Sequence, residues 1–458
     1  MGHLIPATEQ ADPGDRTGRD AGGPGHYVGG PGHYVGGPAT TSMVPGPDQC
    51  QSRREREVAM SEPAPEGPPH ESGGAPRPGG RPLKVGLVSD CYVPRLGGIE
   101  MQVHDLAQNL QKAGHDVVVI TPTPGSELVD GVRVHRMRVP LLPFDIPFTP
   151  ATFRKVSDLL RREQVDVAHF AGGIASPLAF IGAANAQADG VPTVITTHCL
   201  WSYAAPAFDL LDKRFHWTDW PVVFSAVSDV AAAPIRKIGG PTLDVEVLPN
   251  GIDHAAWQVT PLPRDVDHVT VISVMRLAPR KRPMHLLKMI RRVREQLPAT
   301  LRLRLVIVGE GPERGSLERY IVRHGLDDAV QLVGRLSRDE IRTEFARSDI
   351  FVAPANLESF GIAALEARCA GLPVVAKART GIREFVANGQ EGLLAQSDRD
   401  MVDQLLWLIR DPELRHRIAA HNREVPSRVD WSEVVGVNVA AYHRAIDLMG
   451  SRRAAQPG

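Results

Sequence analysis

The sequence predicts an α/β protein with two doubly wound domains, each built on a parallel sheet. From Leu83 onward, short β-branched runs alternate with amphipathic stretches, which is typical of βαβ units. A proline-rich, poorly periodic stretch at 258–268 interrupts this alternation, which then resumes. The length of 458 residues agrees with two or three domains of about 150 residues each.

The first series of strands predicts an N-terminal domain over residues 82–257. It opens with LKVGLVSD, followed by a helical pattern from Ile99 to Lys112, and continues with β-branched runs at 116–122, 132–139, 165–170, 193–198, 222–228 and 245–251. A second series, VTVISVMRL, LRLVIVGEG, VQLVGRL, DIFVAPA and LPVVAKA, predicts a domain over 258–430. Ligands of open α/β sheets bind beyond the carboxyl ends of the strands, so we expect a site in a cleft between two facing domains.

Residues 1–81 are expected to form a disordered tail. The first 80 residues hold 17 of the 43 glycines and 13 of the 39 prolines, and GGPGHYV occurs twice in tandem, at 22–28 and 29–35. Such a segment buries too little apolar surface to offset its ordering entropy. The repeated His26 and His33 offer a weak metal site, but a solvated tail is the favoured interpretation.

Charge and cysteine content exclude several classes of function. Lys plus Arg (52) almost cancels Asp plus Glu (53), so no net field attracts nucleic acid. The four cysteines lie far apart without a C-x-x-C pair, which fits neither a zinc site nor a disulfide framework. No secretion signal and no apolar run of about 18 residues is visible. We expect a cytoplasmic protein, with peripheral contact at the inner face of the membrane left open.

The sharpest chemical signal is ANLESFGIAALE, residues 355–366. Glu358 follows a predicted strand, Ser359-Phe360-Gly361 opens a helix, and Glu366 lies one turn inside that helix. Free N–H groups at a helix start can hold anionic oxygens, and Gly361 allows a ligand to approach closely. Glu358 would accept hydroxyl groups and Glu366 could meet a ribose. Acidic residues favoured by the helix dipole are the plainer explanation.

Two cations suit a diphosphate. Arg276 and Lys281 follow the first strand of the second domain at a spacing of five. Each charge-assisted hydrogen bond to phosphate contributes roughly 1.5 to 3 kcal/mol. A solvated basic turn is the competing interpretation. A diphosphate site is favoured because Arg276 and Glu358 belong to strands of the same predicted domain.

Other candidate residues with weaker functional signals also lie directly after predicted strands. Gly309 and Gly311 resemble the opening of a dinucleotide fingerprint but fail its full pattern, so they mark a turn that either admits a nucleotide or is structural. Gly97 and Gly98 lie in a loop that could face donor phosphates or sugar, and a plain tight turn is the competing interpretation. His198 ends another strand; a single histidine is more often a structural residue, but this one points toward the predicted cleft. Asn250-Gly251, a turn at the domain junction, is expected to be architectural.

Metal chemistry finds little support. The carboxylate-x-carboxylate pair of Asp265 and Asp267 precedes a strand in the linker, and Arg276 and Lys281 already supply cations for phosphate. No Ser/His/Asp triad, P-loop or zinc spacing is present. We expect neither a metal nor a cofactor.

Taken together, these stretches resemble the retaining glycosyltransferases of family 4, whose GT-B architecture has two facing Rossmann-like domains. The resemblance covers about 83–450, and five motifs occur in the family's order: PRLGGIE, TTHCLW, LPNGID, RLAPRK and ESFGIAALE. CYVPRLGGIEMQVHDLAQNLQKAGHDV together with THCLWSYA is most similar to the branch that glycosylates inositol lipids, including N-acetylglucosaminyl-phosphatidylinositol synthases.

The resemblance implies a role for each candidate residue. Arg276 and Lys281 would bind the donor diphosphate, Glu366 the ribose, and Glu358 the sugar hydroxyls beside the backbone of Phe360 and Gly361. Gly98 and His198 would reach the donor from the first domain, and a helix over 431–450 would cross back onto that domain. The family's usual residue after the phosphate lysine is glycine, whereas Arg282 and Pro283 follow here.

The implied reaction moves a hexose or N-acetylhexosamine from a UDP- or GDP-linked donor to a hydroxyl acceptor with retention and without a metal. The leaving phosphate itself would take the acceptor proton, which explains why no catalytic carboxylate is evident in the first domain. The apolar and basic segment 138–155 would either touch a lipid acceptor or pack over the cleft. A nucleotide-sugar epimerase and a non-catalytic carbohydrate-binding scaffold are the competing functions.

Overall fold

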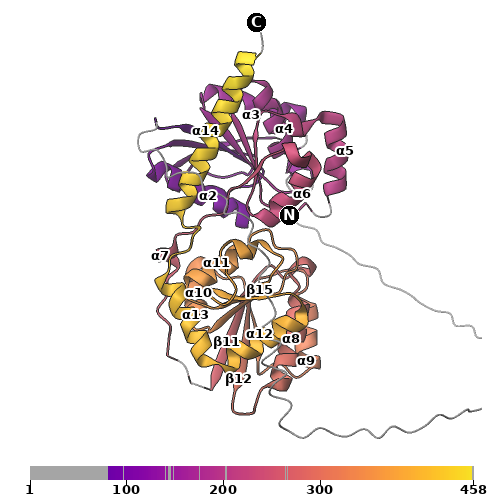
Figure 1. The fold of residues 1–458 in the computed structure, drawn as a ribbon, viewed down its shortest axis with the longest axis vertical. Helices are drawn as coiled ribbons and strands as arrows, with labels where there is room; N and C mark the ends of the chain where they lie inside the picture. The colour runs from indigo at the N-terminus through magenta and orange to yellow at the C-terminus, as the bar shows by residue number, and fades with distance from the viewer. Residues whose placement is uncertain are drawn as a thin grey trace, which may run out of the picture. The chain divides into compact units, whose positions relative to one another are not determined.

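The computed structural model describes residues 81–455, except for 96, 140, 143–145, 148, 175, 202–203, 264 and 266. The predicted tail lies outside the described residues apart from Arg81, and so do the repeats with His26 and His33. The described chain forms two α/β domains, each with its own mostly or wholly parallel sheet flanked by helices (Figure 1). The predicted fold class is confirmed in this respect.

The first domain is built on an eight-stranded sheet in the order β10-β9-β8-β7-β1-β2-β4-β3, parallel except for the β3–β4 pair. Its strands are β1 Lys84–Ser89, β2 Asp116–Thr121, β3 Leu128–Val129, β4 Val132–Arg136, β7 Val167–Gly172, β8 Thr193–Thr197, β9 Val223–Ala226 and β10 Val245–Val247; β5 Leu141–Leu142 and β6 Ile146–Pro147 pair separately. Its helices are α2 Gly98–Lys112, α3 Pro150–Arg162, α4 Pro177–Ala188, α5 Ala205–Phe215, α6 Asp229–Gly239 and α7 His254–Trp257.

The second domain has a six-stranded, wholly parallel sheet in the order β13-β12-β11-β14-β15-β16. Its strands are β11 His268–Val274, β12 Arg302–Val308, β13 Val330–Gly334, β14 Ile350–Ala353, β15 Val374–Lys377 and β16 Gly392–Ala395. The helices that follow them are α8 Pro283–Gln296, α9 Arg314–Arg323, α10 Arg338–Ala346, α11 Ile362–Cys369, α12 Asp398–Arg410 and α13 Pro412–Glu424. The chain closes with α14 Trp431–Ala455.

Strand order reverses direction once in each sheet. The reversal lies between β1 and β7 in the first sheet and between β11 and β14 in the second. At such a switch point, the connections that follow the two neighbouring strands pass to opposite faces of the sheet. A crevice therefore opens at the carboxyl ends of these two strands. The loops after these four strands are therefore where a ligand is expected.

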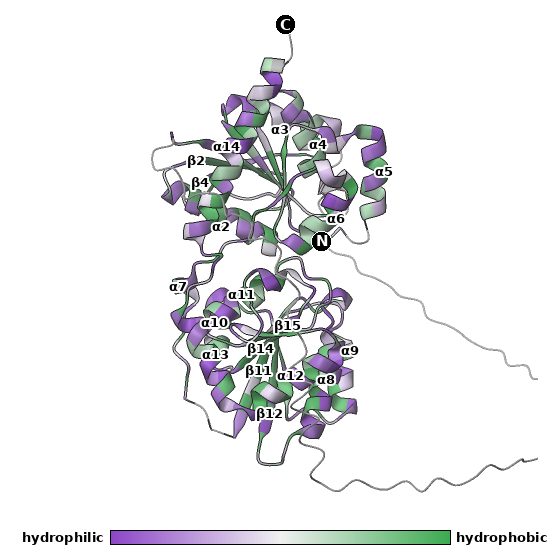
Figure 2. Cartoon of the chain, in the orientation of Figure 1, coloured by the Kyte–Doolittle hydropathy of each residue, from purple (hydrophilic) through white to green (hydrophobic). Residues whose placement is uncertain are grey.

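The β-branched runs form buried strands because helices cover both faces of a parallel sheet. Val117 to Ile120 of β2, for example, are fully buried. Figure 2 shows the same pattern, with much of the central strands in green, for hydrophobic residues, and many hydrophilic residues in purple along the surrounding helices. No helix within the described residues combines the length and the apolarity needed to cross a membrane.

Helix α14 packs on the first domain although it is the last element of the described residues. The hydroxyl of Tyr442 lies 2.9 Å from Nδ1 of His169 in β7, and the guanidinium of Arg453 donates to the carbonyl of Gly190 at 2.8 Å. The helix continues to Ala455, beyond the 431–450 stretch that the sequence suggested. The first domain is thus built from both ends of the described chain.

Candidate functional site

The switch point of the second sheet brings together three of the predicted residues. Arg276 and Lys281 follow β11, and Glu358 follows its neighbour β14. Nζ of Lys281 donates to Oε2 of Glu358 at 2.5 Å, with their side chains 25% and 15% exposed. Arg276 is exposed, and its side chain has no partner within the part of the chain that the structure describes. The pair and the free guanidinium offer two cations and one carboxylate at the expected place.

Helix α11 begins at Ile362, four residues after Glu358, and leaves its first N–H groups without a side-chain cap. Gly361 is its N-cap with φ +93°, a conformation that disfavours residues with a Cβ. A Cβ at this position would also lie 2.6 Å from Cγ1 of Ile382. Phe360 is 1% exposed and packs on Phe385, which fixes the loop. The helix start can therefore receive an anion, and Gly361 is required by backbone conformation and packing as well.

Glu366 lies inside α11 and faces two charged groups. Burial raises the pKa of Glu366 to about 8; the positive charge of Arg338 opposes this rise, and the carboxylate of Asp105 adds to it. Arg338 of α10 and Asp105 of α2 form an ion pair of 3.0 Å between the two domains. Glu366 is thus a protonated carboxyl below about pH 8 and can donate as well as accept a hydrogen bond with a hydroxyl group.

The turn after β12 packs on the loop that carries Arg276. Gly309 has φ +133°, and a Cβ there would lie 1.9 Å from the carbonyl oxygen of Met275. A Cβ at Gly311 would lie 2.4 Å from the carbonyl oxygen of Leu277. Backbone packing therefore accounts for both glycines. Contact of this turn with a nucleotide stays a prediction.

The start of α2 meets the start of α11. A Cβ on Gly98 would lie 3.5 Å from Cδ1 of Ile362, and Ser228, after β9, donates to the carbonyl of Ser359 at 2.5 Å. Gly97 is extended, and a Cβ there would collide with the Glu100 carboxylate. Because the contacting loops follow carboxyl ends of strands in both domains, these edges of the two sheets face each other.

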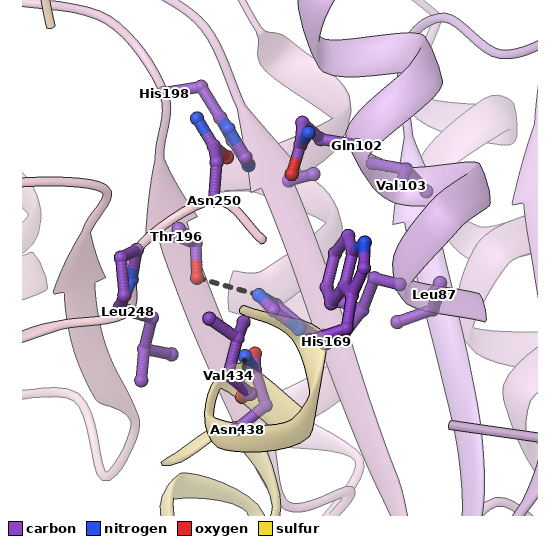
Figure 3. A pocket seen from close by; sticks show the side chains of 14 residues that line it. Leu87, Gln102, Val103, His169, Thr196, His198, Leu248, Asn250, Val434 and Asn438 are labelled. Carbon is purple, nitrogen blue, oxygen red and sulfur yellow. Dashed lines mark hydrogen bonds between the residues drawn. The ribbon is translucent and has the colours of Figure 1, made fainter. Parts of the chain in front are cut away.

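His198 follows β8 and lines a cavity of about 30 Å³ inside the first domain (Figure 3). Its backbone N–H donates to the carbonyl of Gly172 at 2.8 Å. Burial lowers the pKa of His198 to about 4, and a hydrogen bond with the side chain of Asn250 opposes the shift. The imidazole is therefore neutral near pH 7. No described contact joins His198 to Lys281 or Glu358, although these two charges act on the thiol of the adjacent Cys199.

Asn250 is a functional candidate that the sequence analysis treated as architectural. The amide of Gln102 in α2 holds Gly251 twice, donating to its carbonyl at 3.1 Å and accepting from its N–H at 3.0 Å. Trp431 covers the same glycine, since a Cβ there would lie 2.4 Å from the indole. Figure 3 shows Asn250 directly beside His198. The sequence signal for this role was an Asn-Gly turn that follows β10, two strands away from β8 in the same sheet.

Replacing Asn250 with aspartate should raise the pKa of His198 from about 4 toward its ordinary value of 6.5. A carboxylate within hydrogen-bonding distance stabilises the imidazolium, whereas the amide does so weakly. Among the described residues, His169 of β7 is a titratable neighbour, and its pKa is lowered by burial and, to a smaller extent, by the charge of His198. NMR titration of the His198 ring in both proteins measures the change. Titration of His198 near pH 4 in the Asn250→Asp variant would show that the two side chains do not interact.

Asp90, directly after the carboxyl end of β1, is a candidate residue that was not identified from the sequence. Burial raises its pKa to about 6, against hydrogen bonds from Ser176 and from the N–H of Leu178. Its Oδ2 atom is buried without a partner among the described residues. No catalytic carboxylate was expected in the first domain. Asp90 directly follows the first predicted strand, which is the signal that would have found it.

Two further expectations concern metals and cysteines. Ligand atoms of Asp265, Asp267 and His268 lie within 4.8 Å of one another, but at the amino end of β11, on the opposite edge from the predicted site. Cys91, Cys199 and Cys369, the cysteines in the described part of the chain, are unpaired. The absence of a metal from the reaction stays a prediction.

Two family models match the chain in tandem. "Glycosyltransferase Family 4" matches residues 96–256, and "Glycosyl transferases group 1" matches 260–425. The chain belongs to glycosyltransferase family 4. Among relatives of this family-4 chain, a phosphatidylinositol N-acetylglucosaminyltransferase subunit of Arabidopsis thaliana is 28% identical over 80% of this chain and 82% of its own. The human protein of the same name is 30% identical over 67% of this chain and 64% of its own.

Proteins named for other functions are also similar to this chain. Glycogen synthase of Mycobacterium tuberculosis is 28% identical over 79% of this chain and 94% of its own. Among solved structures, HepE of Anabaena in complex with UDP and glucose covers 78% of this chain and 98% of its own, with TM-score 0.61 and 20% identity. Sucrose-phosphate synthase of Thermosynechococcus elongatus covers 80% of this chain and 99% of its own, with TM-score 0.64 and 20% identity. These structures establish the GT-B fold.

Proposed function

We propose that this family 4 enzyme transfers N-acetylglucosamine from its UDP-linked donor to a hydroxyl of an inositol lipid, with retention. The observation that carries the proposal is the similarity over 80% of the chain to the Arabidopsis phosphatidylinositol N-acetylglucosaminyltransferase protein. A UDP donor, in preference to a GDP donor, is supported by the fold shared with HepE, which binds UDP and glucose.

The donor diphosphate would be held by Arg276 and Lys281. Arg276 has no competing partner among the described residues, and an ammonium has three N–H donors, so Lys281 can hold Glu358 and a phosphate oxygen together. Glu358 would then present its remaining oxygen to the sugar hydroxyls. Cations placed where charge develops on the leaving phosphate stabilise the transition state, so no metal is required.

Retention follows if the acceptor attacks from the face that the diphosphate leaves. The bond from the anomeric carbon to the phosphate oxygen breaks, the bond to the acceptor oxygen forms, and the acceptor proton passes to the leaving phosphate. His198, neutral because it is buried, would hydrogen-bond the sugar near this face without adding charge. Glu366, inside α11, would bind the ribose.

A lipid acceptor implies contact with a membrane surface. The segment proposed for that contact is 138–155; its Phe144 and Phe148 lie outside the described residues. Arg154 and Lys155, at the start of α3, are exposed and carry positive charge toward solvent. We place the enzyme peripherally, at the cytoplasmic face, where anionic headgroups attract such residues.

A donor and acceptor panel tests the proposal. The protein is incubated with UDP-N-acetylglucosamine, UDP-glucose or GDP-mannose, together with vesicles that contain phosphatidylinositol or with a soluble glucan. UDP release with formation of an N-acetylglucosaminyl lipid is the expected result. A glucan product would favour an activity like that of the mycobacterial glycogen synthase. An isomerised sugar would indicate an epimerase, and binding without turnover a carbohydrate-binding scaffold.

A further inference from the structure

Arg282 occupies a backbone position that suits glycine. It follows Lys281 and precedes Pro283, with φ +60° and ψ +40°, in the left-handed region. Residues with a Cβ pay a conformational cost there, whereas glycine does not. The family's usual glycine at this place fits that geometry. An arginine that keeps the strained conformation must be held by its side chain.

The guanidinium of Arg282 is held by four hydrogen bonds. It is 14% exposed and forms a two-pronged pair with Asp398, at 2.9 Å to Oδ1 and 2.7 Å to Oδ2. It also donates to the carbonyl of Pro354 at 3.1 Å and to Oδ1 of Asn356 at 2.9 Å. Asp398 is held in turn by Lys377 at 2.6 Å, and hydrogen bonds from Arg282 and Lys377 keep its pKa below the ordinary range.

These bonds tie together the two loops of the switch point. The backbone of Arg282 continues the turn that ends with Lys281, and its side chain grips the loop after β14 that leads from Pro354 to Glu358. Asp398 fixes the same guanidinium to the start of α12. The Lys281–Glu358 pair is therefore bracketed by a rigid clamp of charged groups.

We propose that Arg282, anchored by Asp398, is a positioning residue that sets the Lys281 turn against the Glu358 loop and so pre-arranges the donor site. This rests on the proposed donor-binding function. Pre-arranged charges bind and stabilise a diphosphate without reorganising, and a group misplaced by about 1 Å can cost on the order of a hundredfold in rate. Arg282 touches no substrate in this role.

Arg282→Gly tests the clamp because glycine accepts the same backbone angles, so the fold is not forced to change. We expect the Kd for UDP to rise at least fivefold and kcat/KM for the donor to fall at least tenfold, with little change in Tm. Asp398→Asn, which leaves Arg282 in place, should reproduce part of both effects. Arg282→Lys, which keeps the charge and loses the fork, should rescue little.

Arg294→Ala is the matched control. Arg294 lies at the far end of the same helix, α8, and forms an equivalent two-pronged pair with Asp328 at 2.7 and 2.6 Å. Its removal should leave UDP affinity and kcat/KM unchanged. A positioning role also predicts coupling: in a Glu358→Ala background, Arg282→Gly should lower kcat/KM by less than it does in the wild type.

The possible results separate the clamp from the proposed function. If the wild type neither binds UDP by calorimetry nor releases it from a sugar donor, the proposed function fails and the clamp's role fails with it. If the wild type is active and Arg282→Gly behaves like Arg294→Ala, the clamp alone is overturned. A loss of Tm with normal Kd and KM would likewise reduce Arg282 to a stabilising residue.

Discussion

Replacing Lys281 with alanine should lower kcat/KM at least about tenfold, the scale of one lost charged contact near 1.4 kcal/mol. The substitution removes a cation proposed to stabilise the leaving phosphate. It also leaves the Glu358 carboxylate, 15% exposed, without its ion-pair partner. Glu358→Ala should have an effect of similar size, because the sugar loses a hydroxyl acceptor and Lys281 loses the group that orients it. Steady-state kinetics with varied donor measure both.

The control for this pair is Lys288→Ala, which removes an exposed lysine from α8 at a distance from the switch point. It should leave kcat/KM unchanged. Circular dichroism should show that all three variants keep the fold. Near-normal rates in both Lys281→Ala and Glu358→Ala would remove these residues from the site.

Glu366→Gln should stabilise the protein at high pH while it weakens nucleotide binding. The folded-state pKa of Glu366 is about 8, above its ordinary 4.5, so the native state binds more protons between these values. The unfolding free energy therefore falls as pH rises from about 4.5 to about 8. A neutral glutamine avoids this loss. We expect a gain of roughly 2 kcal/mol at pH 8.5, less than the full shift would give, because the side chain of Glu366 is only partly buried and solvent screens its charge.

Denaturation of both proteins at pH 5 and at pH 8.5 measures the effect. The difference between them should be small at pH 5, where the carboxyl is protonated in the folded protein, and large at pH 8.5. The exposed Glu424→Gln should change neither value. Equal stability of wild type and Glu366→Gln at both pH values would mean that the carboxyl is well solvated.

The sequence was informative for candidate functional residues that lie directly after strands. Lys281 and Glu358 could be predicted to share a site because each follows a β-branched run of the same domain, and β11 and β14 are indeed neighbours. The motif ESFGIAALE located the helix start that Gly361 caps. Periodicity alone, however, does not give the order of strands in a sheet. It therefore could not say which loops flank each switch point.

Residues whose roles depend on long-range contacts could not be predicted. Gln102 holds Gly251 across 149 positions, and Arg282 reaches Asp398 across 116. Nothing local in the sequence marks these pairs. Arg282 was noted only as a departure from the usual glycine, since its left-handed conformation is visible only in the structure. The glycines at 309 and 311 likewise carried a motif-like signal that backbone packing explains.

Helix α14 has a consequence for how the molecule can be divided. Tyr442 completes a buried chain of hydrogen bonds that runs through His169 and Thr196 to Ser225, linking three strands of the first sheet. The second domain is in effect an insertion between the main body of its neighbour and that neighbour's last helix. A fragment cut at the boundary near residue 257 would lose this helix and bare its partners. To produce the two domains as separate proteins, α14 would have to be joined to the first domain.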